Sequence, residues 1–157
     1  MEASVNTLVQ LRSKEWRNIL PNCRALCIAA SDATWQRVNM INGPYELSIV
    51  LANDKFVKKL NNKFRGKNNP TNVLSFPAAA DSINMTGDIQ SLGDIVLALE
   101  TVLAESQENL SQHFSHLIVH GCLHLFGHDH IEEAEALAME ALEIEILKTL
   151  NIKNPYT

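Results

Sequence analysis

Apolar and polar positions along the chain follow two spacings, and each spacing predicts one kind of element. Four segments have the alternating or continuous apolar pattern of short strands. They are Val5–Gln10, Tyr45–Leu51, Val73–Phe76 and Asp94–Leu99. A turn of Asn42, Gly43 and Pro44 precedes the second strand, and Pro77 ends the third.

Elsewhere the apolar residues recur every three or four positions, as they do along one face of a helix. Ser13 caps a helical stretch that Pro21 restarts. Further helices are expected from Asn53 or Asp54 to Phe64, and over Glu100–Glu108, Ser111–Phe126 and Ile131–Leu150. The small, polar stretch Ala78–Ser91 predicts a surface loop. Strands mixed with helices, followed by an all-helical last third, predict one α+β domain over residues 1–157, with a small mixed four-stranded sheet covered by helices.

Composition narrows the class of protein. The chain has 157 residues, 46% of them apolar and 20% charged, which is ordinary for a globular domain with a substantial core. No apolar run approaches the ~18 residues of a membrane span, and the first residues lack the pattern of a secretory signal. The three cysteines are odd in number and form no CxxC pair, which indicates a reducing compartment. We therefore expect a cytoplasmic protein without a membrane partner.

The charges are unevenly distributed. The net charge of −5 by itself argues against a nucleic-acid binder, but six positive charges and no acid lie between positions 55 and 67. Lys55, Lys59 and Lys63 recur every four residues along the helix predicted there, apart from its apolar stripe. Such a surface can bind phosphates, and it can equally be a solvated helix face without a ligand. The glutamates between Glu132 and Glu145 are interpreted as a second solvated face.

All six histidines of the chain lie within eighteen consecutive residues. His120 and His124 are four apart, so on a helix both imidazoles project from one face and can share a metal ion. His116 continues the stripe, but three successive turns span roughly 12 Å along the axis, too far for one ion. Gly127 can end the helix and let the chain fold back, which makes His130 the third ligand. The pattern H-x3-H-x5-H therefore predicts a metal site.

Three neutral nitrogens leave a fourth position for water, which is the arrangement of catalytic zinc. Structural zinc would instead take a fourth protein ligand, for which His128 and Asp129 are candidates. Cys122 is a poor candidate, because it points to the other side of the helix, towards the core. Gly121 stands where zinc proteases of the HExxH type place their catalytic glutamate, which counts against a peptidase.

Three segments of the chain resemble one known family. HGCLHLFGHDH, His120–His130, resembles the HGxLHLxGYDH signature of the YbeY family of bacterial metal-dependent endoribonucleases. FRGKNNPTNVLSFP, Phe64–Pro77, looks like the arginine-bearing segment of that family, and LGDI, Leu92–Ile95, looks like its fourth-strand motif. The likeness covers most of the chain from about Tyr45 to Leu150. It departs at His128, where the family has tyrosine, so the metal ligands are intact and a neighbour of the site is changed.

The resemblance implies a zincin-like fold with a metal-binding helix, one zinc ion per chain held by His120, His124 and His130, and an active-site arginine at Arg65. It also implies single-stranded RNA as substrate, with the 3′ end of 16S rRNA as the usual target in ribosome maturation and quality control. We therefore expect a zinc-dependent, single-strand-specific endoribonuclease with Arg65 and His124 as catalytic residues. Its expected partner is the ribosome or its small subunit, and no DNA substrate is expected.

Two other functions stay open. One is a zinc metallopeptidase or another zinc hydrolase of zincin-like fold. The other is a non-catalytic ribosome-assembly factor with structural zinc and a lysine-rich docking surface. Asp94, at the start of the predicted fourth strand, either caps a turn or has a role near the site.

Overall fold

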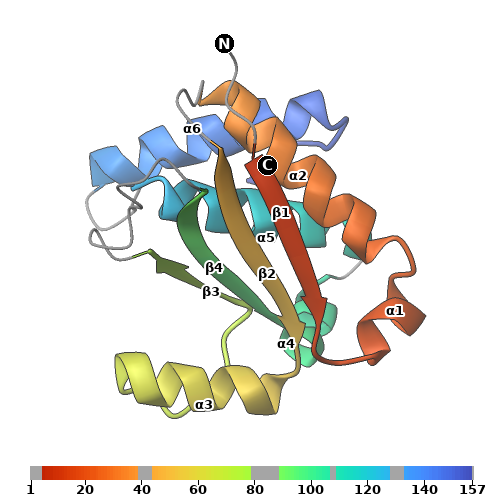
Figure 1. The fold of residues 1–157 in the computed structure, drawn as a ribbon. Coiled ribbons are helices and arrows are strands. Elements are labelled where there is room, and N and C mark those ends of the chain that lie inside the picture. The colour runs from red at the N-terminus through yellow and green to blue at the C-terminus, as the bar shows by residue number, and fades with distance from the viewer. Residues whose placement is uncertain (1–4, 39–43, 79–88, 107–108, 128–132, 157) are drawn as a thin grey trace.

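The computed structural model describes residues 5–38, 44–78, 89–106, 109–127 and 133–156 (Figure 1). Within these ranges the strands are β1 (Val5–Leu11), β2 (Tyr45–Ala52), β3 (Val73–Pro77) and β4 (Gln90–Ala98). They form one sheet in the order β1-β2-β4-β3. β1, β2 and β4 run parallel, and β3 pairs antiparallel with β4 at the edge. The predicted mixed four-stranded sheet is confirmed.

The described residues also form helices at each place where the apolar spacing predicted one. They are α1 (Glu15–Ile19), α2 (Cys23–Arg37), α3 (Asp54–Arg65), α4 (Leu99–Glu105), α5 (Leu110–Leu125) and α6 (Glu133–Thr149). The largest error in the prediction concerns β4, which begins at Gln90, inside the predicted surface loop. Gln90 and Ser91 are polar but pair with Tyr45 and Glu46 of β2, a main-chain interaction that an apolar pattern does not reveal.

Side chains of the sheet alternate between two hydrophobic cores. Ile95 and Leu97 of β4 join the main core, to which α2, α5 and α6 contribute. Val96 and Ala98 point the other way and pack with Val57 of α3 in a smaller core. Figure 1 shows α2, α5 and α6 gathered on one side of the sheet and α3 apart from them. α3 and α5 therefore lie against opposite faces.

The lysine-rich helix α3 is held in a fixed orientation. The side chain of Asn53 accepts a hydrogen bond of 2.9 Å from the backbone N–H of Phe56, as expected of its cap. Asp54 accepts hydrogen bonds from the backbone and hydroxyl of Thr101, at the start of α4. The helix is buried at Val57, and its basic residues and those just beyond it are exposed. These are Lys55, Lys58, Lys59, Lys63, Arg65 and Lys67.

α5 ends where the sequence predicted. Its last residue is Leu125, and Gly127 has a φ of 94°, a left-handed conformation that favours glycine. The predicted return of the chain, at residues 128–130, lies outside the described residues. None of the described helices is both long enough and apolar enough to cross a membrane.

Candidate metal centre

Two histidine rings meet on the outer side of α5. Nε2 of His120 lies 3.1 Å from Nε2 of His124, and the ring centroids are 4.6 Å apart at an angle of 75°. The convergence follows from the four-residue spacing on a helix. Both residues are only partly buried.

This geometry suits a shared metal ion. Two imidazole nitrogens bound to tetrahedral zinc at about 2.0–2.1 Å would lie about 3.3 Å apart, close to the observed 3.1 Å. In the part of the chain that the structure describes, no group of three or more histidines, cysteines or carboxylates could hold a metal. The predicted third ligand, His130, lies outside the described residues, as do His128 and Asp129. The described residues thus offer two of the three predicted donors.

The inner side of α5 faces the sheet closely. A Cβ added at Gly121 would lie 3.0–3.2 Å from side-chain atoms of Ile95. Cys122 is fully buried, with its sulfur 3.7 Å from the hydroxyl of Ser31, and burial raises its pKa to about 12. The prediction that Cys122 points to the core is confirmed. Gly121 occupies the position of the HExxH glutamate, so a glutamate there would press against the side chain of Ile95.

Glu143 of α6 is buried beside the histidines, with an exposed fraction of 0%. Its Oε1 lies 2.6 Å from Nδ1 of His120, and its Oε2 lies 2.9 Å from Nε2 of His116. The hydroxyl of Tyr156, in the C-terminal tail, also donates a hydrogen bond to Oε2. The interpretation of the glutamates between Glu132 and Glu145 as a solvated face is therefore wrong at Glu143.

A signal for this burial is present in the sequence. Met139, Glu143, Ile146 and Leu147 are the buried residues of α6, so the glutamate occupies a position in a core stripe. A carboxylate at such a position needs a partner, because an unpaired buried charge is costly. Burial raises the pKa of Glu143, but hydrogen bonds from the two histidines and Tyr156 outweigh it and bring the pKa down to about 2. Glu143 is therefore ionised at neutral pH.

Arg65, the predicted catalytic arginine, is the exposed last residue of α3. It lies on the opposite face of the sheet from α5, so the structure does not bring it together with the histidine pair. Both sites adjoin the edge strand β3, however. The hydroxyl of Ser75 donates a 3.3 Å hydrogen bond to the carbonyl of Gly121, and the next residue, Phe76, packs edge-on against Phe64 at 5.4 Å. One edge strand therefore lies between the end of α3 and the histidine turn of α5.

The LGDI segment lies where three elements meet. Asp94 lies inside β4, opposite Ser48 and Phe76, so of its two predicted roles the turn cap is wrong, and a role near the site stays a prediction. Asp94 is exposed as a residue, and partial burial of its carboxyl raises the pKa of that group. Gly93 has a φ of 127°, and an added Cβ would come within 2.2 Å of the Phe76 carbonyl and 3.0 Å of Leu125. Glycine at this position lets both β3 and α5 approach β4.

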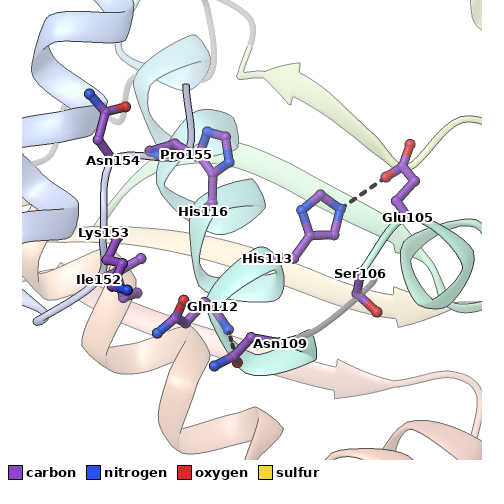
Figure 2. Close-up of a pocket in the computed structure, with 10 residues that line it drawn as sticks. All are labelled: Glu105, Ser106, Asn109, Gln112, His113, His116, Ile152, Lys153, Asn154 and Pro155. Carbon is purple, nitrogen blue, oxygen red and sulfur yellow. Dashed lines mark hydrogen bonds and ion pairs between the residues drawn. The ribbon is translucent and has the colours of Figure 1, made fainter. Parts of the chain in front are cut away.

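A pocket of about 440 Å³ lies beside the first turns of α5, against the C-terminal tail (Figure 2). His113 lines it and forms a hydrogen bond of 3.0 Å with Glu105, away from the pair formed by His120 and His124. His116, one turn further along, also lines the pocket and contacts Glu143 on its other side. The pocket therefore adjoins the buried carboxylate and does not contain the histidine pair.

Comparisons with known proteins identify the family. The family described as Endoribonuclease YbeY matches residues 10–151. An Endoribonuclease YbeY of Paramagnetospirillum magneticum is 42% identical over 161 aligned residues, covering 99% of this chain and 98% of that protein. Another, from Parvibaculum lavamentivorans, is 51% identical over 120 residues, 71% of this chain and 65% of that protein.

A solved structure supports the fold. The solution structure of TM1509 from Thermotoga maritima covers 94% of this chain and 91% of its own, with a TM-score of 0.51 and 19% identity. At this identity the likeness concerns the fold alone. The family match extends from β1 to the end of α6 and includes both histidines of the pair. The chain belongs to the YbeY family of endoribonucleases.

Proposed function

We propose that this protein is a zinc-dependent endoribonuclease that cleaves single-stranded RNA at the histidine pair of α5. The observation that carries the proposal is the convergence of the Nε2 atoms of His120 and His124, 3.1 Å apart, on a helix whose inner side packs on the sheet. Membership of a family of endoribonucleases supplies the class of reaction. The close approach at Gly121 holds the backbone of both histidines in place.

The metal we propose is one zinc ion per chain, held by His120, His124 and His130. Neutral imidazoles are common zinc ligands, and three of them leave a coordination position open. Bound zinc supplies charge stabilisation for a phosphate oxygen and makes a bound water more acidic. The protein itself holds the Nε2 atoms of His120 and His124 in fixed directions. His124 is proposed as a catalytic residue because it binds the metal on which cleavage depends.

Arg65 is proposed to bind the reacting phosphate. Its planar guanidinium can donate two hydrogen bonds to a phosphate group and offset the negative charge that grows there during cleavage. An RNA strand that crosses the β3 edge can meet both Arg65 and the histidine pair, because β3 contacts α5 through Ser75 and the end of α3 through Phe76. The exposed lysines of α3 extend that path.

Single-stranded RNA fits this path better than a duplex. Phe64 is 58% exposed, and Nζ of Lys63 lies 5.1 Å from the centroid of its ring. An aromatic ring beside cations is typical of sites where unpaired bases stack. We propose the precursor of 16S rRNA as the substrate, cut near its 3′ end on the small ribosomal subunit in the cytoplasm.

Gly121 argues against a zinc peptidase, the second candidate. The Cβ of any larger residue there would press against Ile95, which is fully buried, so a glutamate cannot serve as base from this position without moving the helix. A non-catalytic assembly factor would share the same surface but would not turn over RNA. The two alternatives therefore differ from the proposal in substrate and in turnover.

The test is a cleavage assay with zinc-loaded protein. The substrates are a labelled single-stranded oligoribonucleotide, the same strand in a duplex, its DNA copy and an unstructured peptide. His124→Ala and His113→Ala are assayed in parallel. We expect cleavage of the single-stranded RNA alone, lost in His124→Ala and kept in His113→Ala. Equal cleavage by His124→Ala contradicts the proposal, peptide cleavage favours the peptidase, and no cleavage favours the assembly factor.

A further inference from the structure

Glu143 contacts the histidine pair from behind. Its Oε1 lies 2.6 Å from Nδ1 of His120, while Nε2 of the same ring lies 3.1 Å from Nε2 of His124. The two nitrogens of His120 thus face different partners. One faces the buried carboxylate on α6, and the other faces the proposed metal position.

We propose that Glu143 is a positioning residue that fixes His120 in the tautomer with its proton on Nδ1 and its lone pair on Nε2. A carboxylate can only accept a hydrogen bond, so Nδ1 of His120 must donate. A neutral imidazole carries one N–H, which leaves Nε2 unprotonated and directed at His124. The proposal deepens the proposed function, since it rests on His120 being a metal ligand.

Glu143 contacts His120 at Nδ1, the ring nitrogen that faces away from the proposed metal position, so it supports a ligand instead of acting as one. Its Oε1 accepts from His120, and its Oε2 contacts His116 and accepts from the hydroxyl of Tyr156. Hydrogen bonds on both oxygens fix the position of the carboxylate itself. Carboxylate partners of this kind orient metal-binding histidines and raise their basicity.

Tyr156 connects this arrangement to the C-terminal tail. Its ring stands edge-on to His116 with centroids 5.6 Å apart, and its hydroxyl reaches the carboxylate of Glu143. His116 is too far along the helix to share one ion with both His120 and His124. In this arrangement it fixes the carboxylate of Glu143, which in turn orients His120.

A purely structural ion pair is the competing explanation. It predicts that removal of Glu143 changes stability and leaves the His120 tautomer and the zinc affinity unchanged. Glu143→Met separates the two, because methionine fits a stripe of Met139, Ile146 and Leu147 but cannot accept the proton of His120. Glu143→Gln keeps an acceptor without the charge. Glu135→Met makes the same chemical change at an exposed position of α6 and is the matched control.

The experiment measures two quantities in each variant. Long-range ¹H–¹⁵N NMR of the metal-free protein reports the tautomer of His120, and competition with a chelator reports the dissociation constant for zinc. We expect the Nδ1–H tautomer in the wild type and in Glu135→Met, and its loss in Glu143→Met together with about 10- to 100-fold weaker zinc binding. Glu143→Gln should fall between the two.

Tyr156→Phe keeps the proposal testable if Glu143→Met fails to fold, because it removes one donor to Glu143 at the end of the chain. It should weaken zinc binding a few-fold. An unchanged tautomer and unchanged affinity in Glu143→Met, or in Glu143→Gln and Tyr156→Phe where Glu143→Met does not fold, would overturn the proposal. If the proposed function fails instead, the results differ from these. His120→Ala then leaves the zinc affinity unchanged, while the tautomer of His120 still changes in Glu143→Met.

Discussion

Individual side chains decide how closely α5 approaches the sheet and what its outer side can hold. Gly121 faces Ile95 on the inner side, while its neighbour His120 faces outward to His124 and Glu143. The missing Cβ at Gly121 thus serves packing, and the same absence removes the base of an HExxH site. One residue accounts for both properties.

Gly93 gives a stability prediction at this scale. Gly93→Ala should lower the free energy of unfolding by more than about 3 kcal/mol, because its Cβ would overlap the carbonyl of Phe76 in a left-handed conformation. Gly66→Ala is the control. Gly66 has a φ of 68° but open space around its Cβ position, so it should lose only about 1 kcal/mol. Urea unfolding measures both, and equal losses would show that β3 does not approach β4 as described.

Arg65 gives a prediction about cleavage. Arg65→Ala should keep zinc and fold but lose about 10²-fold in the cleavage rate, because it removes a phosphate contact and no ligand. Arg65→Lys should recover part of the rate, since an ammonium cannot reproduce a two-pronged hydrogen bond. Cleavage at the wild-type rate by Arg65→Ala would remove this residue from the mechanism.

The secondary structure elements were largely predictable, because each has an apolar stripe that must be buried. α3 and α5 appear within one or two residues of their expected bounds, with the cap of α3 at Asn53. The start of β4 was not predictable, because polar Gln90 is held by pairing with β2. The charge of Glu143 favours exposure, whereas its position in the apolar stripe of α6 favours burial, and the position decides.

The lysine stripe of α3 gives a prediction at the scale of one element. If Lys55, Lys59 and Lys63 contact RNA, affinity should fall as salt rises, with a slope of roughly −0.7 per phosphate contacted. Replacing all three by Gln should weaken binding and flatten that slope by up to roughly two units. The cleavage rate at saturating RNA should change much less. Unchanged affinity and slope would make the stripe a solvated helix face.

The whole molecule places its two groups of candidate residues on opposite faces of one sheet. The motifs alone implied that Arg65 acts beside the histidines, but strand alternation and sheet order decide which face each helix covers. A local sequence pattern predicts neither the order of strands in the sheet nor the face that each helix covers. The site we propose therefore depends on β3 being the edge strand, with Ser75 against α5 and Phe76 against α3.

The main core gives a prediction about thiol reactivity. Cys23, Cys27 and Cys122 are 2%, 0% and 0% exposed, and burial raises the pKa of Cys27 and of Cys122. A raised thiol pKa keeps the unreactive neutral form at neutral pH. A thiol reagent should therefore modify none of the three in the folded protein and all of them in denaturant. Rapid modification of the folded protein would contradict this packing of the core.

The zinc content of purified variants tests the central claim, that the histidine pair of α5 holds the metal on which cleavage depends. We predict about one zinc per chain in the wild type and in His113→Ala, since His113 pairs with Glu105 instead. His120→Ala and His124→Ala should each lose most of it, and His130→Ala should do the same if it is the third ligand. Wild-type zinc content in His124→Ala would contradict the account.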